Sequence, residues 1–189
     1  MLWARRDMAD DVRIKFRASG CFCLFEDRVL LMQRNGLKPF GLHWSIPTGK
    51  IEDDESPSEC MSRELGEELN VDVDEGNLAL IADFVVDAAP DDRFRYLTYV
   101  TRFNTTRGLT PRLEEVHKIE WRRLDQVAKR KVVPYFYNTL NALMDWEIGG
   151  STQVGAFPEP EAHRVDRRRV TEYRARRGHT AQEEDAGRP

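Results

Sequence analysis

The chain has 189 residues, of which 40% are hydrophobic, and this is enough for one ordinary domain with a sizeable core. The net charge is −4 and is unevenly placed, because eight Arg oppose five Asp or Glu between Arg164 and Pro189. The rest of the chain is therefore acidic, which argues against general nucleic-acid binding, where a basic face is usual, and suits a protein that gathers divalent cations.

Strands are predicted from short apolar runs bounded by turn residues, at residues 17–25, 29–34, 44–46, 78–86, 95–103 and 117–122. The first two runs are separated by Glu26-Asp27-Arg28 and read as a hairpin. Residues 35–43 read as a loop and residues 87–92 as a surface turn, because both are rich in turn formers. Residues 134–146 predict a closing helix with Pro134 at its start.

Strands thus precede and follow a central helix at residues 57–69, and this mixture favours an α+β layered fold. The pattern fails after residue 148. We therefore expect an N-terminal extension at 1–15, a folded domain at 16–148, and a linker with an Arg-rich, flexible tail at 149–189. Part of that tail has the composition of a helix.

Cysteine usage indicates a reducing compartment. Cys21 and Cys23 alternate with Phe22 in an apolar run, which predicts buried strand thiols, and with Cys60 the three cysteines lack metal-ligand spacing. No stretch has the length of a signal peptide or of a membrane span. We expect a cytoplasmic protein without a membrane partner.

Both ends of the central helix are marked in the sequence. Ser56 can cap the N-terminus, Pro57 fits the first helical position, and Glu59 completes a Ser-x-x-Glu capping box. Asn70 stands where the helix should stop, and Asn is one of the few non-glycine residues that accepts the left-handed conformation common there. These signals predict a helix that ends before Asn70.

The two faces of this helix differ. The apolar stripe that would seat it on a sheet consists of Met61, Leu65 and Leu69. Away from that stripe, Glu64, Glu67 and Glu68 share one face at spacings i, i+3 and i+4. Such neighbours repel by roughly 0.2–0.5 kcal/mol per pair, a sign that a hard divalent cation would reverse. A solvated acidic face is the plain alternative for a Glu-rich helix.

The stretch from Gly49 to Val71 resembles the Nudix box. That box reads Gly, five residues, Glu, seven residues, then Arg-Glu-apolar-x-Glu-Glu-x-Gly-apolar. The residues that match in register are Gly49, Glu55, Arg63, Glu64, Leu65, Glu67, Glu68 and Val71. Asn70 alone departs, in place of the last Gly. The resemblance implies an α/β/α sandwich with a mixed sheet, the box loop and helix over the sheet, and a C-terminal helix.

The resemblance also implies residue roles. Glu64, Glu67 and Glu68 would bind Mg²⁺ or Mn²⁺, together with the main-chain carbonyl of Thr48 just before Gly49. Arg63 would pair with Glu55 and brace the loop against the helix. The catalytic candidates are Glu64, Glu67 and Glu115.

Glu64 is the first candidate for the general base and Glu115 the second. Two candidates remain because members of the family do not place the base at a single fixed position. Glu115 precedes Trp121 by six residues, and Glu114 and Glu120 compete with it for the role of an acidic residue outside the box. Surface charge is the plain alternative for all three.

Substrate contacts are only weakly indicated. Lys50, Arg34, Lys38 and Arg95 are candidate phosphate partners, and core packing competes with base stacking for the aromatic candidates Phe40, Trp44, Tyr96 and Tyr135. Lys50 is equally interpretable as a surface lysine. Glu52 is interpreted as an exposed surface carboxylate.

The function implied is metal-dependent hydrolysis of a diphosphate linkage in a nucleoside-diphosphate-X substrate, with a (deoxy)nucleoside triphosphate pyrophosphohydrolase slightly favoured. The alternatives are an RNA 5′-end pyrophosphohydrolase, which the Arg-rich tail would suit, and a non-catalytic nucleotide-binding regulator. Isoprenoid diphosphate isomerisation is disfavoured, because the segment before the box has His43 and no Cys. A homodimer is left open.

Overall fold

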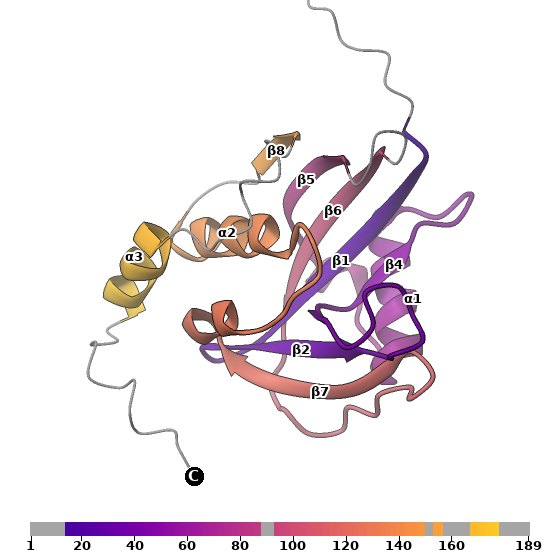
Figure 1. The fold of residues 1–189 in the computed structure, drawn as a ribbon, viewed down its shortest axis with the longest axis horizontal. Coiled ribbons are helices and arrows are strands. Elements are labelled where there is room, and N and C mark those ends of the chain that lie inside the picture. Colours follow the sequence, from indigo (N-terminus) through magenta and orange to yellow (C-terminus); the bar gives the residue numbers. More distant parts are fainter. Residues whose placement is uncertain (1–13, 88–92, 150–152, 157–166, 178–189) are drawn as a thin grey trace, which may run out of the picture.

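The computed structural model describes residues 14–87, 93–149, 153–156 and 167–177. The strands are β1 (Phe16–Phe25), β2 (Arg28–Arg34), β3 (Trp44–Ser45), β4 (Thr48–Lys50), β5 (Ala79–Asp87), β6 (Arg93–Arg102), β7 (Val116–Arg123) and β8 (Gln153–Ala156). The α-helices are α1 (Pro57–Leu69), α2 (Phe136–Glu147) and α3 (Arg167–Arg177), and the short 3₁₀ helices are η1 (Glu75–Asn77) and η2 (Leu124–Lys129). Figure 1 shows their arrangement.

The strands form one mixed sheet with β1 near its middle. Its main path runs β3-β2-β1-β6-β5-β8, while β4 pairs with β1 and β7 with β2. The β1–β6 and β5–β8 pairs are parallel, and the others are antiparallel. β1 leaves β2 after a short pairing near Phe25 and Arg28, so the sheet opens there and admits β4 beside β1.

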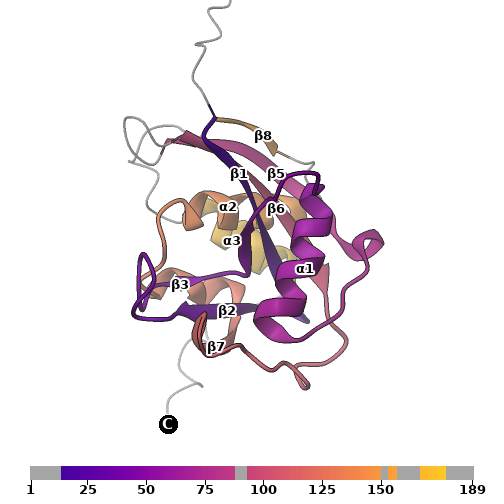
Figure 2. The same ribbon diagram turned by 90° about the vertical axis from the view of Figure 1, so that its right-hand side faces the viewer.

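Helices cover both faces of this sheet. One face of β1 presents Cys21 and Cys23 to the apolar stripe of α1, and all three residues of that stripe are fully buried. The opposite face presents Phe22 and Leu24 to α2. In Figure 2 α1 lies in front of the strands, with α2 and α3 behind them. The predicted α/β/α sandwich with a mixed sheet is confirmed, and Cys21 and Cys23 are the buried strand thiols expected.

Two boundaries differ from the sequence prediction. α2 begins at Phe136, because Tyr135 is its N-cap with φ of 58°, so Pro134 lies in the preceding turn. The triplet 48–50, expected only as the start of the box loop, is strand β4. Most of the predicted turn at 87–92 lies outside the described residues.

The segment after residue 149 also differs from the expected linker and flexible tail, as far as it is described. β8 pairs with β5 and extends the sheet, and α3 packs against α2. Tyr173 of α3 is 4% exposed and belongs to the core cluster on the α2 face, an anchor that the Arg-rich composition conceals. Two arginines of α3 bind domain carboxylates, Arg169 to Asp145 and Arg174 to Asp125. None of the described helices is long and apolar enough to cross a membrane.

Candidate active site

Helix α1 begins and ends as its sequence predicts. The Ser56 hydroxyl accepts the backbone N–H of Glu59, and the Glu59 carboxylate accepts the backbone N–H of Ser56, which completes the capping box. Asn70 ends the helix in the left-handed conformation, with φ of 55°. With its apolar stripe fixed to the sheet, α1 holds its three glutamates on one face.

Strand β4 forms the floor beneath these glutamates. The β1–β4 ladder is bonded through Cys21 N–H to the Pro47 carbonyl and through Ile51 N–H to the Arg17 carbonyl. Because antiparallel bonding alternates along a strand, the main-chain groups of Thr48 and Lys50 point away from β1. Two contacts agree: the Lys50 carbonyl accepts from Arg63, and the Thr48 N–H donates to Glu68. The Thr48 carbonyl therefore faces α1, the orientation that a metal ligand requires.

Gly49 lets Glu64 approach the strand. A Cβ placed on Gly49 would lie 2.0 Å from both Cδ and Oε1 of Glu64. The glutamate side chain therefore occupies the space that any larger residue would fill. This contact gives a physical reason for glycine at the first position of the box.

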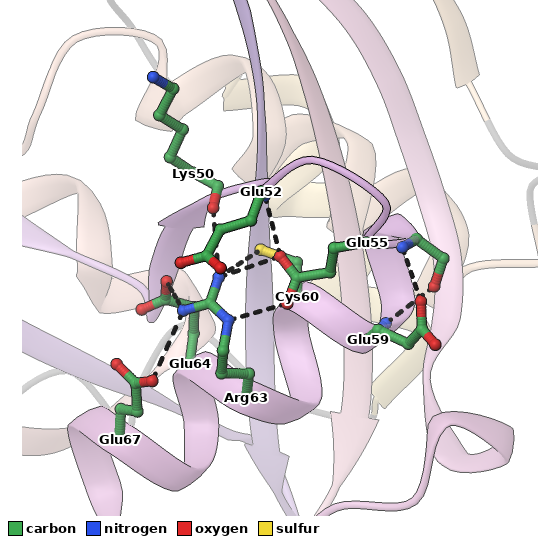
Figure 3. A network of polar contacts seen from close by, with 9 residues as sticks. Lys50, Glu52, Glu55, Glu59, Cys60, Arg63, Glu64 and Glu67 are labelled. Atoms are coloured by element: carbon green, nitrogen blue, oxygen red, sulfur yellow. Dashed lines mark hydrogen bonds and ion pairs between the residues drawn. The ribbon is translucent and has the colours of Figure 1, made fainter.

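Arg63 connects the loop to the helix (Figure 3). Its Nε and Nη2 bind the two oxygens of Glu55 at 2.8 and 3.0 Å, and Nη1 lies 2.7 Å from Glu64 Oε1. The guanidinium lowers the pKa of Glu55. Arg63 also lies 3.7 Å from Glu67. The expected Arg63–Glu55 pair is present, and it fixes Glu64 as well.

The box glutamates line a polar cavity of about 290 Å³, here called the carboxylate cavity. Its wall consists of Glu64, Glu67, Glu68, Glu115, Arg34 and Arg112, with residues 48–50 as its floor. Burial, reinforced by neighbouring Glu64, raises the pKa of Glu68 to about 8. Burial also raises the pKa of Glu64, and Arg63 opposes that rise. Glu67 is 46% exposed and stands at the mouth.

Glu115 reaches the carboxylate cavity from the loop that precedes β7. The loop before β7 is bonded to the end of the helix, because Thr110 and Arg112 donate their N–H groups to the carbonyls of Leu69 and Glu68. The Glu115 carboxylate lies 2.7 Å from Lys38 Nζ.

The two competitors of Glu115 lie elsewhere. Glu120 is engaged on β7 by Arg122 and Arg130. Glu114 is exposed and does not line the carboxylate cavity. Among the three acidic candidates outside the box, Glu115 is the one that the fold brings to the box glutamates.

The donor set fits a hard divalent cation by chemistry. Every candidate ligand is an oxygen, and the raised pKa values of Glu64 and Glu68 show that burial disfavours their charged forms, which a bound cation would stabilise. In the described part of the chain, however, no three acidic, imidazole or thiol groups already converge on one point. Arg63, Lys38 and the Thr48 N–H hold the carboxylates instead, so a cation would be bound after these side chains turn.

A recess of about 160 Å³ adjoins the carboxylate cavity, and Arg34 and Thr48 line both. Phe40, Tyr96 and Tyr135 also line the recess. Thr48 Oγ1 donates to the Ile46 carbonyl, so Tyr96 donates its hydroxyl to Thr48 and is held in place. Arg34 is anchored by Nε to the Pro39 carbonyl, and its two Nη atoms make no hydrogen bond within the described residues.

Of the other predicted substrate contacts, Trp44 and Arg95 are engaged elsewhere and Lys50 lines the carboxylate cavity. Trp44 is buried in the core, with Lys118 and Arg130 over its ring, and lines neither cavity. Arg95 is bound by both oxygens of Asp83. Lys50 lines the carboxylate cavity while its ammonium lies over the Phe16 ring.

Arg112 lines the carboxylate cavity and was missed by sequence reasoning. Its one sequence signal is its place three residues before Glu115. Glu52, interpreted as exposed, is exposed.

Comparison with known proteins agrees with this geometry. The sequence model of the NUDIX domain matches residues 15–143. The chain is 36% identical over 74 residues to an 8-oxo-dGTP diphosphatase of Proteus vulgaris, a match that covers 39% of this chain and 63% of that protein. It is 35% identical over 78 residues to a dihydroneopterin triphosphate diphosphatase of Haemophilus influenzae, covering 40% of this chain and 48% of that protein.

These matches span less than two thirds of the curated relatives' length. Among solved structures, a MutT NUDIX hydrolase from Burkholderia pseudomallei has the same fold, with a TM-score of 0.59 at 19% identity over 68% of this chain and 97% of that one. Since the family match takes in more than half of the residues and the box geometry is in place, the chain belongs to the NUDIX domain family.

Proposed function

We propose that this protein hydrolyses a diphosphate linkage of a nucleoside-diphosphate-X substrate with the help of Mg²⁺ or Mn²⁺, and that a (deoxy)nucleoside triphosphate is its preferred class. The names of the two curated relatives, both diphosphatases, support the reaction type. The observation that carries the proposal is the pair of adjoining cavities, one rich in carboxylates and one lined by aromatic side chains. A nucleotide has two matching parts: phosphates, which would meet a cation held by the carboxylates, and a base, which would lie against the aromatic side chains.

The residues divide the work between them. Glu64, Glu67, Glu68 and the Thr48 carbonyl would hold the cation, with Glu115 as a further oxygen donor. When bound, the cation neutralises charge on the phosphate oxygens and lowers the pKa of water. Arg34 has two Nη atoms available at the boundary of the cavities and would bind a phosphate that spans them.

Glu64 remains the first candidate for the proton acceptor. It is largely buried beside Gly49, and burial raises its pKa, which makes its carboxylate a better base near neutral pH. Glu115 is the second candidate. It is 39% exposed and already pairs with Lys38, which favours a role in closing the cation site.

The proposal is tested with Glu67→Gln and Glu68→Gln. Hydrolysis of a panel of nucleoside triphosphates, nucleotide sugars, ADP-ribose and dinucleoside polyphosphates is measured by phosphate or pyrophosphate release, with Mg²⁺ and with a chelator. We expect cleavage of at least one substrate by the unaltered protein, its loss with the chelator, and a fall of about 100-fold or more in kcat for either variant. Glu114→Gln is the matched control, because Glu114 is exposed outside the cavity, and it should keep full activity.

The proposal fails if no member of the panel is cleaved, or if the Gln variants match the control. An RNA 5′ end is a weaker candidate, because Arg169 and Arg174 of the basic helix α3 are bound to carboxylates of the domain. For an RNA substrate, truncation after residue 149 would remove a steep dependence of activity on salt.

A further inference from the structure

The ion pair between Lys38 and Glu115 lies at the carboxylate cavity, which Glu115 lines. Lys38 Nζ lies 2.7 Å from Glu115 Oε1, and the side chains are 41% and 39% exposed. Glu115 lines the carboxylate cavity, while Pro39 and Phe40, which follow Lys38, line the recess. Lys38 itself lines neither cavity, but its ammonium binds a residue of one and the two residues that follow it in the chain line the other.

The backbones that carry this pair are held together independently of it. Asn35 donates its N–H to the Glu115 carbonyl and its Nδ2 to the Leu113 carbonyl, both at 3.0 Å. Leu37 N–H in turn donates to Asn35 Oδ1. Either side chain can thus swing away while the two loops stay in contact. Separating such an exposed pair costs little.

Lys38 differs in this respect from Arg63. Arg63 binds both oxygens of Glu55, the Lys50 carbonyl and Glu64, and so is fixed from several sides. The Lys38 ammonium has one partner among the described residues, Glu115. Of these two cations, each of which holds a cavity carboxylate, Lys38 is the one that can exchange its partner without disturbing the box loop.

We propose that Lys38 is a positioning residue that exchanges partners: its ammonium holds Glu115 in the free protein, then releases that carboxylate to the divalent cation and pairs with a substrate phosphate. The inference rests on the proposed function and adds the order of contacts to it. The exchange leaves neither Lys38 nor Glu115 unpaired, because each gains an opposite charge as it loses one. In the free protein the ammonium competes for an oxygen that the cation needs.

Competition predicts opposite effects of Lys38→Met on two measurements. Binding of Mn²⁺ to the full chain without nucleotide, followed by electron paramagnetic resonance, should tighten about two- to fivefold, the range expected for an exposed ion pair. The KM for the best nucleotide should rise about tenfold, because a charge-assisted contact to phosphate is lost, and kcat should change less. Lys38→Arg should restore both values toward those of the unaltered protein.

Two controls separate competition from a general change of charge. Lys131→Met removes the same charge from an exposed lysine that lines neither cavity, and it should leave both values unchanged. In a Glu115→Gln background, Lys38→Met should no longer tighten Mn²⁺ binding, since the contested carboxylate is gone.

The inference is overturned if Lys38→Met weakens or does not alter Mn²⁺ binding, or if it tightens binding equally in the Glu115→Gln background. An unchanged KM alongside tighter Mn²⁺ binding overturns the exchange onto phosphate. Mn²⁺ binding is measured without nucleotide. A protein that cleaves no panel member would therefore refute the proposed function and still decide whether Lys38 competes for Glu115.

Discussion

Replacing Gly49 with alanine should move Glu64 and leave the fold intact. The added Cβ would lie 2.0 Å from Glu64 Cδ, whereas non-bonded carbons rest about 3.5–4 Å apart, so the carboxylate must shift by roughly 1.5–2 Å. The clashing atoms end a flexible side chain, and Gly49 is not among the residues with positive φ, so alanine suits its backbone. We expect the free energy of unfolding to change by less than about 1 kcal/mol and kcat/KM to fall about 100-fold.

Urea denaturation and the hydrolysis assay measure the two effects on the same preparation. Gly66→Ala on α1 is the matched control, because a Cβ there meets nothing nearer than the Val71 carbonyl at 3.9 Å. That variant should gain about 0.5–1 kcal/mol of stability and keep its activity. Unchanged hydrolysis by Gly49→Ala would show that Glu64 does not act from the position described. A loss of several kcal/mol would show that residue 49 supports the fold itself.

Three further predictions concern the C-terminal cap of α1, the Arg63–Glu55 ion pair and the packing of α3. Asn70→Ala should lower the free energy of unfolding by about 1 kcal/mol and Asn70→Gly should not, since φ at this residue is 55°; urea denaturation of both tests this, and equal losses would contradict it. Arg63 lowers the pKa of Glu55, so this pair stabilises the fold above the unfolded-state pKa and the contribution is lost as pH falls through the lower folded-state value. The difference in unfolding free energy between the unaltered protein and Glu55→Gln should therefore shrink from pH 7 toward acid, and a constant difference would refute the linkage. Tyr173→Ala should speed tryptic cleavage within α3 about tenfold or more, because a buried aromatic anchor worth about 3–5 kcal/mol is lost, whereas exposed Glu172→Ala should not.

The helix of the site could be predicted because its signals are local. The capping box at Ser56 and Glu59, the apolar stripe and Asn70 all lie within fifteen residues, and each acts through the nearest turns of the chain. The Arg63–Glu55 pair was implied by the resemblance to the Nudix box, and its members are only eight residues apart. Such features need no knowledge of distant strands.

The remaining features depend on contacts that local pattern does not encode. Lys38 and Glu115 are 77 residues apart in sequence, and the β2–β7 pairing brings them together. Trp44 was a candidate for stacking on a base. It lies in the two-residue strand β3, however, and its ring is packed in the core. Arg95 looked free to bind phosphate, yet the β5–β6 register places Asp83 beside it. In each case a partner from another segment of the chain decided the role of the side chain.

The alternation along β4 has a consequence for how this segment can vary. Substitution at residue 48 leaves its carbonyl facing α1, because that direction is set by the strand and does not depend on the side chain. Threonine at this position is therefore compatible with a main-chain ligand to the cation. A single-residue insertion or deletion between Pro47 and Gly49 would instead reverse every peptide that follows, turning the carbonyl into the ladder with β1 and displacing Glu64. The segment should thus accept changes of residue type far more readily than changes of length.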